Sequence, residues 1–328
     1  MPHPLVPRRR AALLLLACLA SPLALAQTAK YPARPITILV GVPAGGAVDQ
    51  VARATAQKLG ETIGVSVLVD NRAGASGMIA ADAVAKAAPD GYTLLVGSQT
   101  HLAVVPQLLK KPPFDPAKDL IAAAPIARSP LLLVVNNELP AKSVKDVIAL
   151  ARAKPGMLNA GSGGAGTTVH MAMELFCSMA QVNITNVSYK GEAPALTDLI
   201  GGQLSLMFPN LSAGLPFAKA GKIRAIAVTS AERSPAAPEL PTIAESGLPG
   251  YDSQTWFGLF APAGTPKEVV QRLAAEVAKM QASPEVKQRF AEQGIAFFPG
   301  TPESFGPYVK SEIAKWGKVI RDNHIQTD

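Results

Sequence analysis

Two glycine-rich turns are the parts of this sequence whose residue types could do chemistry. The first reads GVPAGGAVD over residues 41–49, and the second reads GSGGAGTTVH over residues 161–170. Each precedes a segment with helical spacing, so its glycines would let a ligand approach the unpaired N–H groups and the positive dipole end of a helix. Such helix starts bind anions. The sequence therefore predicts two anion sites; the alternative left open is that each turn is only a tight strand-to-helix connection.

The second turn also matches the G-x-G-x-x-G fingerprint of dinucleotide-binding proteins, through Gly161, Gly163 and Gly166. In that fingerprint an acidic residue about 20 residues further on holds the ribose 2′-OH. Around residue 186 the sequence reads NITNVSYK, which contains no acid. We therefore predict that the turn binds an anion other than a nicotinamide cofactor, and that the protein uses no cofactor.

The side chains near these turns do not form a recognisable catalytic or metal-binding set. Ser162 lies between glycines but does not match the nucleophile elbow G-x-S-x-G. His170 and Glu174 have i, i+4 spacing, which favours a hydrogen bond at the surface or cleft edge over a catalytic role. Beyond the first 26 residues the histidines are His101, His170 and His324, with no H-x-x-x-H pair. We expect a binding protein without catalytic residues or a metal.

Asp49 and Arg53 repeat the i, i+4 spacing at the first turn. Such a pair can be a simple ion pair on a helix surface. Because Asp49 would lie in the first turn of a helix beside Gly45 and Gly46, it could instead accept a hydrogen bond from a ligand. The sequence leaves both interpretations open.

The N-terminal 26 residues read as a secretory signal peptide. Arg8-Arg9-Arg10 precedes the apolar stretch AALLLLACLA, and Ala24-Leu25-Ala26 supplies small residues for cleavage before Gln27. Lipidation of Cys18 is a weaker alternative. Cleavage would lower the formal net charge from +7 to +4 and leave Cys177, in an apolar helical stretch, as a single buried thiol. We predict export to the periplasm and, since no basic run is present, no nucleic-acid partner.

Strand-like and helix-like segments alternate along the rest of the chain. Strands are expected at 36–41, 66–71 and 92–98, with a helix from residue 47 that Gly60 would end. This alternation predicts a parallel, doubly wound sheet. A second α/β set begins near Leu131. Either two domains follow one another with a boundary near residue 128, or the chain crosses out there and returns near residues 224–230.

At this point the sequence resembles a known family. The segments YPARPITILVGVPAGGAVDQVARATAQKLG, VLVDNRAGASG, GSGGAGTTVH and SYKGEAPALTDLIGGQ are similar to those of the tripartite tricarboxylate transporter substrate-binding proteins, the Bug family. The resemblance implies an α/β fold of the two-lobed periplasmic binding protein type II kind, each lobe a mainly parallel sheet flanked by helices, with crossover strands between lobes. It implies lobe 1 at residues 27–128 plus 229–328, lobe 2 at residues 129–228, and a ligand cleft between them.

The resemblance also implies which residues face the ligand. One group comes from the first turn, one from the second, and one lines the cleft between them: Ala44, Gly45, Gly46 and Asp49; Ser162, Thr167 and Thr168; and Ser98, Gln99 and Asn210. The sequence departs from the family at Pro209, where an aspartate is frequent. The loss of that acid removes an anchor for a ligand amine and favours a simple carboxylate over a free amino acid.

The function implied is that of an exported, monomeric receptor that captures a small organic anion, a carboxylate, and presents it to the membrane permease subunits of a tripartite transporter. A receptor that feeds a signalling partner is the alternative.

Overall fold

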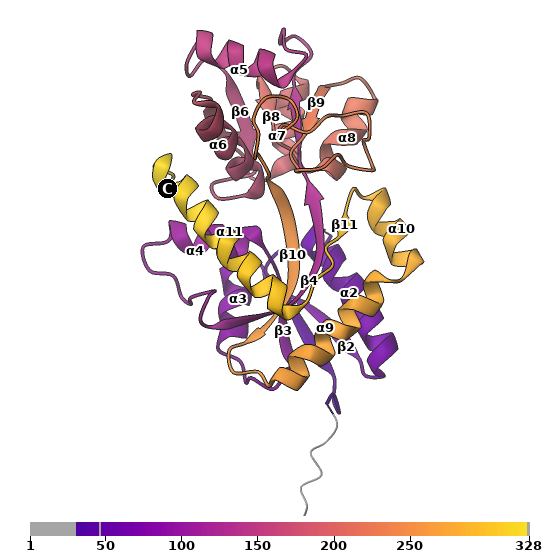
Figure 1. Ribbon diagram of the computed structural model, residues 1–328. Helices are drawn as coiled ribbons and strands as arrows, with labels where there is room; N and C mark the ends of the chain where they lie inside the picture. Colours follow the sequence, from indigo (N-terminus) through magenta and orange to yellow (C-terminus); the bar gives the residue numbers. More distant parts are fainter. Residues whose placement is uncertain (1–30, 46, 327–328) are drawn as a thin grey trace, which may run out of the picture. The chain divides into compact units, whose positions relative to one another are not determined.

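The computed structural model describes residues 31–45 and 47–326. The expectations about the signal peptide, Cys18 and Gly46 lie outside the described residues. From Arg34 onward the chain is built on two β-sheets flanked by helices (Figure 1).

The first sheet has six strands in the order β11-β4-β10-β3-β1-β2. Its strands are β1 (Ile36–Val40), β2 (Val67–Asn71), β3 (Thr93–Ser98), β4 (Leu120–Pro130), β10 (Gln254–Pro262) and β11 (Ala296–Phe297). β1 pairs in parallel with β2 and β3, whereas β10 is antiparallel to β3 and β4. β1 is buried along most of its length because helices cover both faces of a parallel strand, which explains its apolar run ITILV.

The second sheet has five strands in the order β7-β6-β8-β5-β9. They are β5 (Leu132–Val135), β6 (Asn159–Ser162), β7 (Thr185–Ser188), β8 (Leu206–Met207) and β9 (Arg224–Val228). β6 is parallel to β7 and β8, while β5 is antiparallel to β8 and β9. Both sheets are therefore mixed, and their parallel parts are the ones built from strand–loop–helix units.

Helices lie against both sheets. Those that pack with the first sheet are α2 (Ala47–Ile63), α3 (Met78–Ala85), α4 (Val105–Leu108), α9 (Lys267–Gln281), α10 (Pro284–Glu292) and α11 (Pro302–Asp322), with short helical turns η1 (Ala75–Gly77) and η2 (Thr100–Val104). Those of the second sheet are α5 (Val144–Ala153), α6 (Thr168–Ala180), α7 (Glu192–Ile200) and α8 (Leu211–Lys219). In Figure 1, α2 and α9 lie on the opposite side of the first sheet from α3 and α4.

The chain passes between the two sheets at two neighbouring places. β4 continues almost directly into β5, and Leu131 between them donates its N–H to Thr229 Oγ1 (2.7 Å) just after β9. Thr229 N–H in turn donates to the Leu131 carbonyl (3.0 Å). The return segment then enters β10, which pairs with β4. The two crossing segments are thus hydrogen-bonded to each other, and the two-lobed fold with crossover strands is confirmed.

Helix α11 also extends from one sheet to the helices of the other. It begins beside the first sheet with a capping box formed by Thr301 and Ser304, and near its end Asn323 Nδ2 donates to the Glu174 carbonyl of α6 (3.4 Å). Within it, Glu312 is buried and accepts from the ring N–H groups of Trp256 (3.1 Å) and Trp316 (2.9 Å). The charge-assisted bond from Trp256 holds α11 on β10, and the bond from Trp316 lies within α11.

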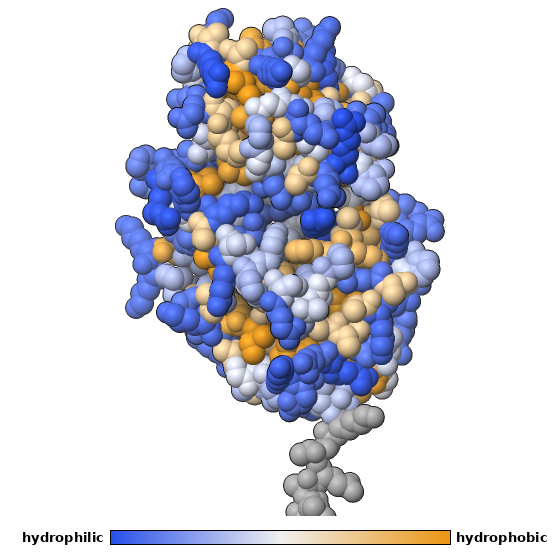
Figure 2. Space-filling view, viewed as in Figure 1, coloured by the Kyte–Doolittle hydropathy of each residue, from blue (hydrophilic) through white to orange (hydrophobic). Residues whose placement is uncertain are grey.

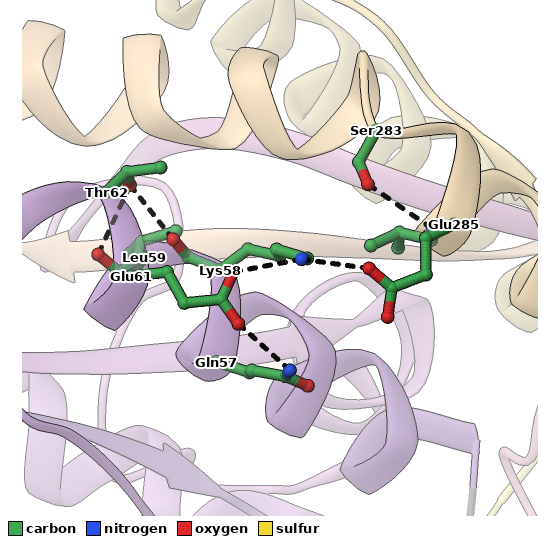
Figure 3. A network of polar contacts seen from close by, with 8 residues as sticks. Gln57, Lys58, Leu59, Glu61, Thr62, Ser283 and Glu285 are labelled. Atoms are coloured by element: carbon green, nitrogen blue, oxygen red, sulfur yellow. Dashed lines mark hydrogen bonds and ion pairs between the residues drawn. The ribbon is translucent and has the colours of Figure 1, made fainter.

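An exposed polar network links α2 to the start of α10 (Figure 3). Lys58 Nζ bonds Glu61 (2.9 Å) within α2 and Glu285 (3.1 Å) at the start of α10. Surface pairs of this kind stabilise a fold only slightly. Their effect here is to define how the start of α10 lies against α2.

Two elements differ from the prediction. Helix α2 does not end at Gly60 but runs three residues further, to Ile63. A glycine inside a helix costs only about 1 kcal/mol, which packing can offset. Strand β4 was not predicted, because its sequence LIAAAPIARSP has only two β-branched residues, Ile121 and Ile126, among alanines and prolines.

None of the helices in the described part of the chain is both long and apolar enough to span a bilayer. The side of the molecule seen in Figure 2 mixes hydrophilic and hydrophobic residues, with blue predominating where the helices of the two sheets meet.

Candidate functional site

The first predicted turn connects β1 to α2 and is closed by Asp49. Gly45 adopts a positive φ of 95° and donates its N–H to Asp49 Oδ2 (2.8 Å). The same carboxylate accepts from Arg53 Nε (2.9 Å) and from Asn71 Nδ2 (2.9 Å). Asp49 is only 2% exposed, whereas Ala44 is exposed. The structure therefore places Asp49 as the residue that holds the turn together.

The charge of Asp49 is stabilised by these partners. Burial by itself would raise the pKa of Asp49, but the hydrogen bonds from Arg53, Gly45 and Asn71 outweigh it, so the pKa lies below its ordinary value. The ion pair with Arg53 predicted as one alternative is present (2.9 Å). Both carboxylate oxygens already accept hydrogen bonds from within the protein.

The second predicted turn begins at Ser162, the last residue of β6. Ser162 is 1% exposed, and among the described residues its hydroxyl has no hydrogen-bond partner. Buried hydroxyls nearly always have a partner, so an isolated one marks a place where a ligand or water would bind. This buried hydroxyl can donate a hydrogen bond to a group that comes close to the turn.

The histidine nearest to this turn is fully engaged elsewhere. His170 is buried; its Nδ1 accepts from the Gly166 N–H (3.2 Å), and its Nε2 lies 3.2 Å from Glu174 Oε1. The two side chains lie close to each other, as their spacing predicts, but His170 is buried and does not lie at the surface. The bond from the Gly166 N–H to His170 holds the second turn on the first coil of α6.

Thr167 and Thr168 start helix α6 in two different ways. Thr167 is the N-cap: its hydroxyl accepts from the His170 N–H (3.4 Å) and donates to the Gly164 carbonyl (2.8 Å). The Thr168 hydroxyl lies 3.3 Å from the hydroxyl of Thr100, at the start of η2. This contact joins the second turn to an element of the first sheet.

Gly166 shows how closely the two sets of elements approach. Its φ is 73°, and a Cβ atom built on it would lie 2.7 Å from Leu108 Cδ1 and 3.4 Å from Val104 Cγ1. A side chain at this position would therefore be strained and would also strike η2 and α4. The glycine allows the turn after β6 to pack against the helical segment after β3.

Ser98 is the last residue of β3, Gln99 follows it, and both are buried. The Ser98 hydroxyl lies 3.4 Å from His101 Nδ1. Gln99 is fully buried, and its amide, oriented to satisfy both neighbours, donates to the Gln254 carbonyl (2.6 Å) and accepts from Trp316 Nε1 (3.1 Å). Burial lowers the pKa of His101 to about 4, so its imidazole is neutral at pH 7.

Asn210 lies just before α8 and is held by a glutamate at the start of α7. Glu192, the first residue of α7, accepts from the Asn210 backbone N–H (2.5 Å) and from its side-chain amide (2.9 Å). Asn210 Oδ1 accepts from the Thr255 hydroxyl of β10 (3.3 Å). Burial raises the pKa of Glu192, and the bonds from Asn210 counteract that effect only in part.

The predicted residues therefore fall into groups. Thr168 and Asn210 contact elements of the first sheet, through Thr100 and Thr255. The hydrogen bonds described for the first turn stay within residues 42–71. Glu192, Thr100 and His101 were not predicted as site residues; the position of Glu192 directly after Gly191, at a helix start, was the available signal. Within residues 31–45 and 47–326 no cluster of acids, histidines and cysteines has the arrangement of a metal site.

Two cavities lie near these elements, one distant from the first turn and one beside it. One of about 890 Å³ lies between α5, α6 and the end of α11 and is lined by Arg152, Cys177 and Lys318 among others. One of about 220 Å³ lies between α2 and α10. Cys177 is buried as predicted, and burial raises the pKa of its thiol to about 12.

Known proteins resemble this chain over nearly its whole length. A family model described as "Tripartite tricarboxylate transporter family receptor" matches residues 51–325. Protein BugT of Bordetella pertussis is 37% identical over 293 residues, which cover 89% of this chain and 90% of that protein.

Two solved structures share both the sequence and the fold. R. palustris Rpa4515 with adipate is 42% identical with a TM-score of 0.79, covering 91% of this chain and 100% of that one. MatC (Rpa3494) from Rhodopseudomonas palustris with bound malate is 32% identical with a TM-score of 0.75, covering 88% and 100%. With a matching receptor model, two-lobed α/β relatives and no enzyme among these matches, the chain belongs to the tripartite tricarboxylate transporter family of solute-binding receptors, which includes the Bug proteins.

Proposed function

We propose that this chain is a periplasmic receptor that captures a small carboxylate and delivers it to the membrane permease subunits of a tripartite tricarboxylate-type transporter. Its relatives of known structure hold adipate and malate, both carboxylates. The predicted export signal and the mild positive charge of the mature chain agree with an anionic solute outside the cytoplasm.

The observation that carries the proposal is the buried, unpartnered hydroxyl of Ser162 at the turn before α6. This hydroxyl can donate a hydrogen bond, and the first N–H groups of α6 lack partners within the helix. A carboxylate that binds there would satisfy both kinds of donor. The contact of Thr168 with Thr100 brings elements of the first sheet to the same turn.

We assign the lobes as residues 27–128 plus 229–328 for lobe 1 and residues 129–228 for lobe 2, with the solute between them. Support comes from the strand order, since β5 to β9 form one sheet and β1 to β4 with β10 and β11 form the other. The paired crossing segments at Leu131 and Thr229 are where such lobes would hinge.

The strength of binding can be estimated from the donors. Charge-assisted hydrogen bonds contribute about 1.5–3 kcal/mol each. Micromolar affinity corresponds to about 8 kcal/mol. Three to five such bonds in a desolvated cleft are therefore enough, without any covalent or metal contribution.

A thermal-shift and calorimetric screen of the mature chain tests the proposal. The panel contains adipate, malate, hexanoate, free amino acids and NAD. We expect carboxylates to raise Tm and to bind with micromolar Kd, and Ser162→Ala to weaken that binding about tenfold, as loss of one such hydrogen bond predicts. Ser178→Ala, near the end of α6, is the matched control. Stabilisation by NAD alone, with none by any carboxylate, would overturn the proposal.

A further inference from the structure

A small basic groove lies between helices α2 and α10, next to the first predicted turn. Its α2 wall carries Gln50, Arg53 and Gln57, which recur every three or four residues and so share one face of the helix. Its α10 wall carries Arg289 and, just past the helix end, Gln293. The cavity has a volume of about 220 Å³, enough for a small anionic group rather than a whole cofactor.

Arg289 leaves positive charge uncompensated in this groove, and Arg53 keeps one free donor group there. Arg289 is half-buried and, within the part of the chain that the structure describes, makes no ion pair or side-chain hydrogen bond. Arg53 uses Nε for Asp49 and Nη2 for Asn71, so its Nη1 remains available. A guanidinium without a partner is the residue type that binds carboxylate and phosphate oxygens in pairs.

Gln293 supplies a further polar group, whose buried side-chain oxygen Oε1 has no hydrogen-bond partner among the described residues. Rotation of the amide by half a turn exchanges its oxygen and nitrogen, so the same side chain can donate to an oxyanion. Ala54 and Phe290 form the apolar part of the lining, which lowers the local dielectric and strengthens contacts with the arginines.

The groove is directly connected to the predicted binding turn. Gln50 Nε2 donates to the Gly45 carbonyl (3.0 Å), and Arg53 bonds the same Asp49 oxygen that accepts from the Gly45 N–H. From Gln50 to Gln57 the helix rises roughly 10 Å, at 1.5 Å per residue. The groove therefore leads from the turn outward along α2.

The walls of the groove are held in place at its far end. Lys58 bonds Glu285 at the start of α10 (3.1 Å), and Gln57 bonds Glu61 (3.0 Å), as Figure 3 shows. The opposite end of α10 carries Arg289. The groove is thus a preformed site between two helices.

We propose that this groove is an oxyanion subsite in which Arg289 and Arg53 bind a carboxylate or phosphate group. The oxyanion has two possible sources. It can be the distal carboxylate of a dicarboxylate solute whose first carboxylate is held at the two turns, a source that rests on the proposed function. It can also be a free inorganic anion that binds beside the turn independently of the solute.

Calorimetry with matched probes tests the subsite and separates the two sources. Adipate and hexanoate differ by one carboxylate, and inorganic phosphate is titrated separately. Arg289→Gln removes the unpaired charge, and Lys287→Gln removes an exposed charge from the same helix without touching the groove. We expect Arg289→Gln to weaken adipate at least tenfold while hexanoate changes less than twofold, and Lys287→Gln to change neither. Arg289→Lys, which keeps the charge but not the paired donors, should lie in between.

Each outcome supports or overturns the subsite, the proposed function or both. A tenfold loss for phosphate but not for adipate supports the subsite with a free anion as its source. Equal affinities of wild type and Arg289→Gln for adipate and for phosphate overturn the subsite and leave the proposed function intact if hexanoate binds. Phosphate binding that depends on Arg289, without binding of any carboxylate, supports the subsite and overturns the proposed function. Failure of wild type to bind any of the three probes overturns both. Melting curves of all variants in phosphate-free buffer check that each is folded, and Arg289→Lys replaces Arg289→Gln if the latter is not.

Discussion

We predict that acid lowers the free energy of unfolding substantially, because the buried His101 must be protonated. The imidazole is 3% exposed and lies against Gly77, where an added Cβ would come within 2.2 Å of its Cδ2. Burial lowers its pKa from 6.5 to about 4. Between these values the unfolded chain binds the proton and the folded one does not, so stability is present at pH 7 and is lost as the pH falls from 6.5 to 4. At 1.36 kcal/mol per unit the loss amounts to about 3 kcal/mol.

Urea unfolding at pH 7, 6, 5 and 4 measures this contribution by difference. His101→Phe keeps a ring in the pocket and cannot titrate, while His324→Asn removes an exposed histidine as the control. Wild type and His324→Asn should lose about 3 kcal/mol more than His101→Phe between pH 7 and pH 4. His101→Gln replaces His101→Phe if the larger ring is not accommodated. Identical losses in wild type and in the His101 variant would show that the buried imidazole takes up a proton without penalty, and would refute the reasoning.

Three further predictions concern residues around the turns and the core. Gly77→Ala combines a φ of 86° with the clash on His101 and should lower the free energy of unfolding by about 3 kcal/mol in urea, whereas a loss below about 1 kcal/mol would show that the ring moves aside. Asp49→Asn places an amide where Gly45, Arg53 and Asn71 all donate and should cost about 2 kcal/mol, with a neutral result contradicting the role given to this carboxylate. Cys177, with a thiol pKa raised to about 12 by burial, should react with a thiol reagent at pH 8 only after unfolding; rapid labelling of the native chain would contradict its burial.

The elements that could be predicted from sequence are those with local signals. The strands at 36–40, 67–71 and 93–98 carry apolar runs that include β-branched residues and lie between turn residues, and all three are parallel neighbours of β1 or are β1 itself. Strand β4 has no such signal. Its alanines and prolines are acceptable because it pairs on both sides, with β10 and β11, so tertiary pairing overrides its low propensity.

The candidate site could be predicted only where its residues are close together in the sequence. Ser162, Thr167 and Thr168 follow from one turn and one helix start, and the structure places them as an unpartnered hydroxyl, a cap and a contact to Thr100. The partnership of Glu192 with Asn210 depends on how α7 lies relative to α8, eighteen residues apart. Spacing within the sequence carries no information on that distance, because a loop and β8 intervene.

The chain's own acids determine which donors a solute can use. Asp49 occupies the Gly45 N–H at the first turn, and Glu192 occupies the backbone N–H of Asn210 and one N–H of its side-chain amide. A carboxylate that took these donors would have to displace an acid of the same charge, and Asp49 is the harder to displace because its pKa is lowered by three partners. Ser162 and the start of α6 have no such competitor. We therefore propose that a bound anion is held mainly by the second turn, and that the first turn contributes through the groove that extends from it along α2.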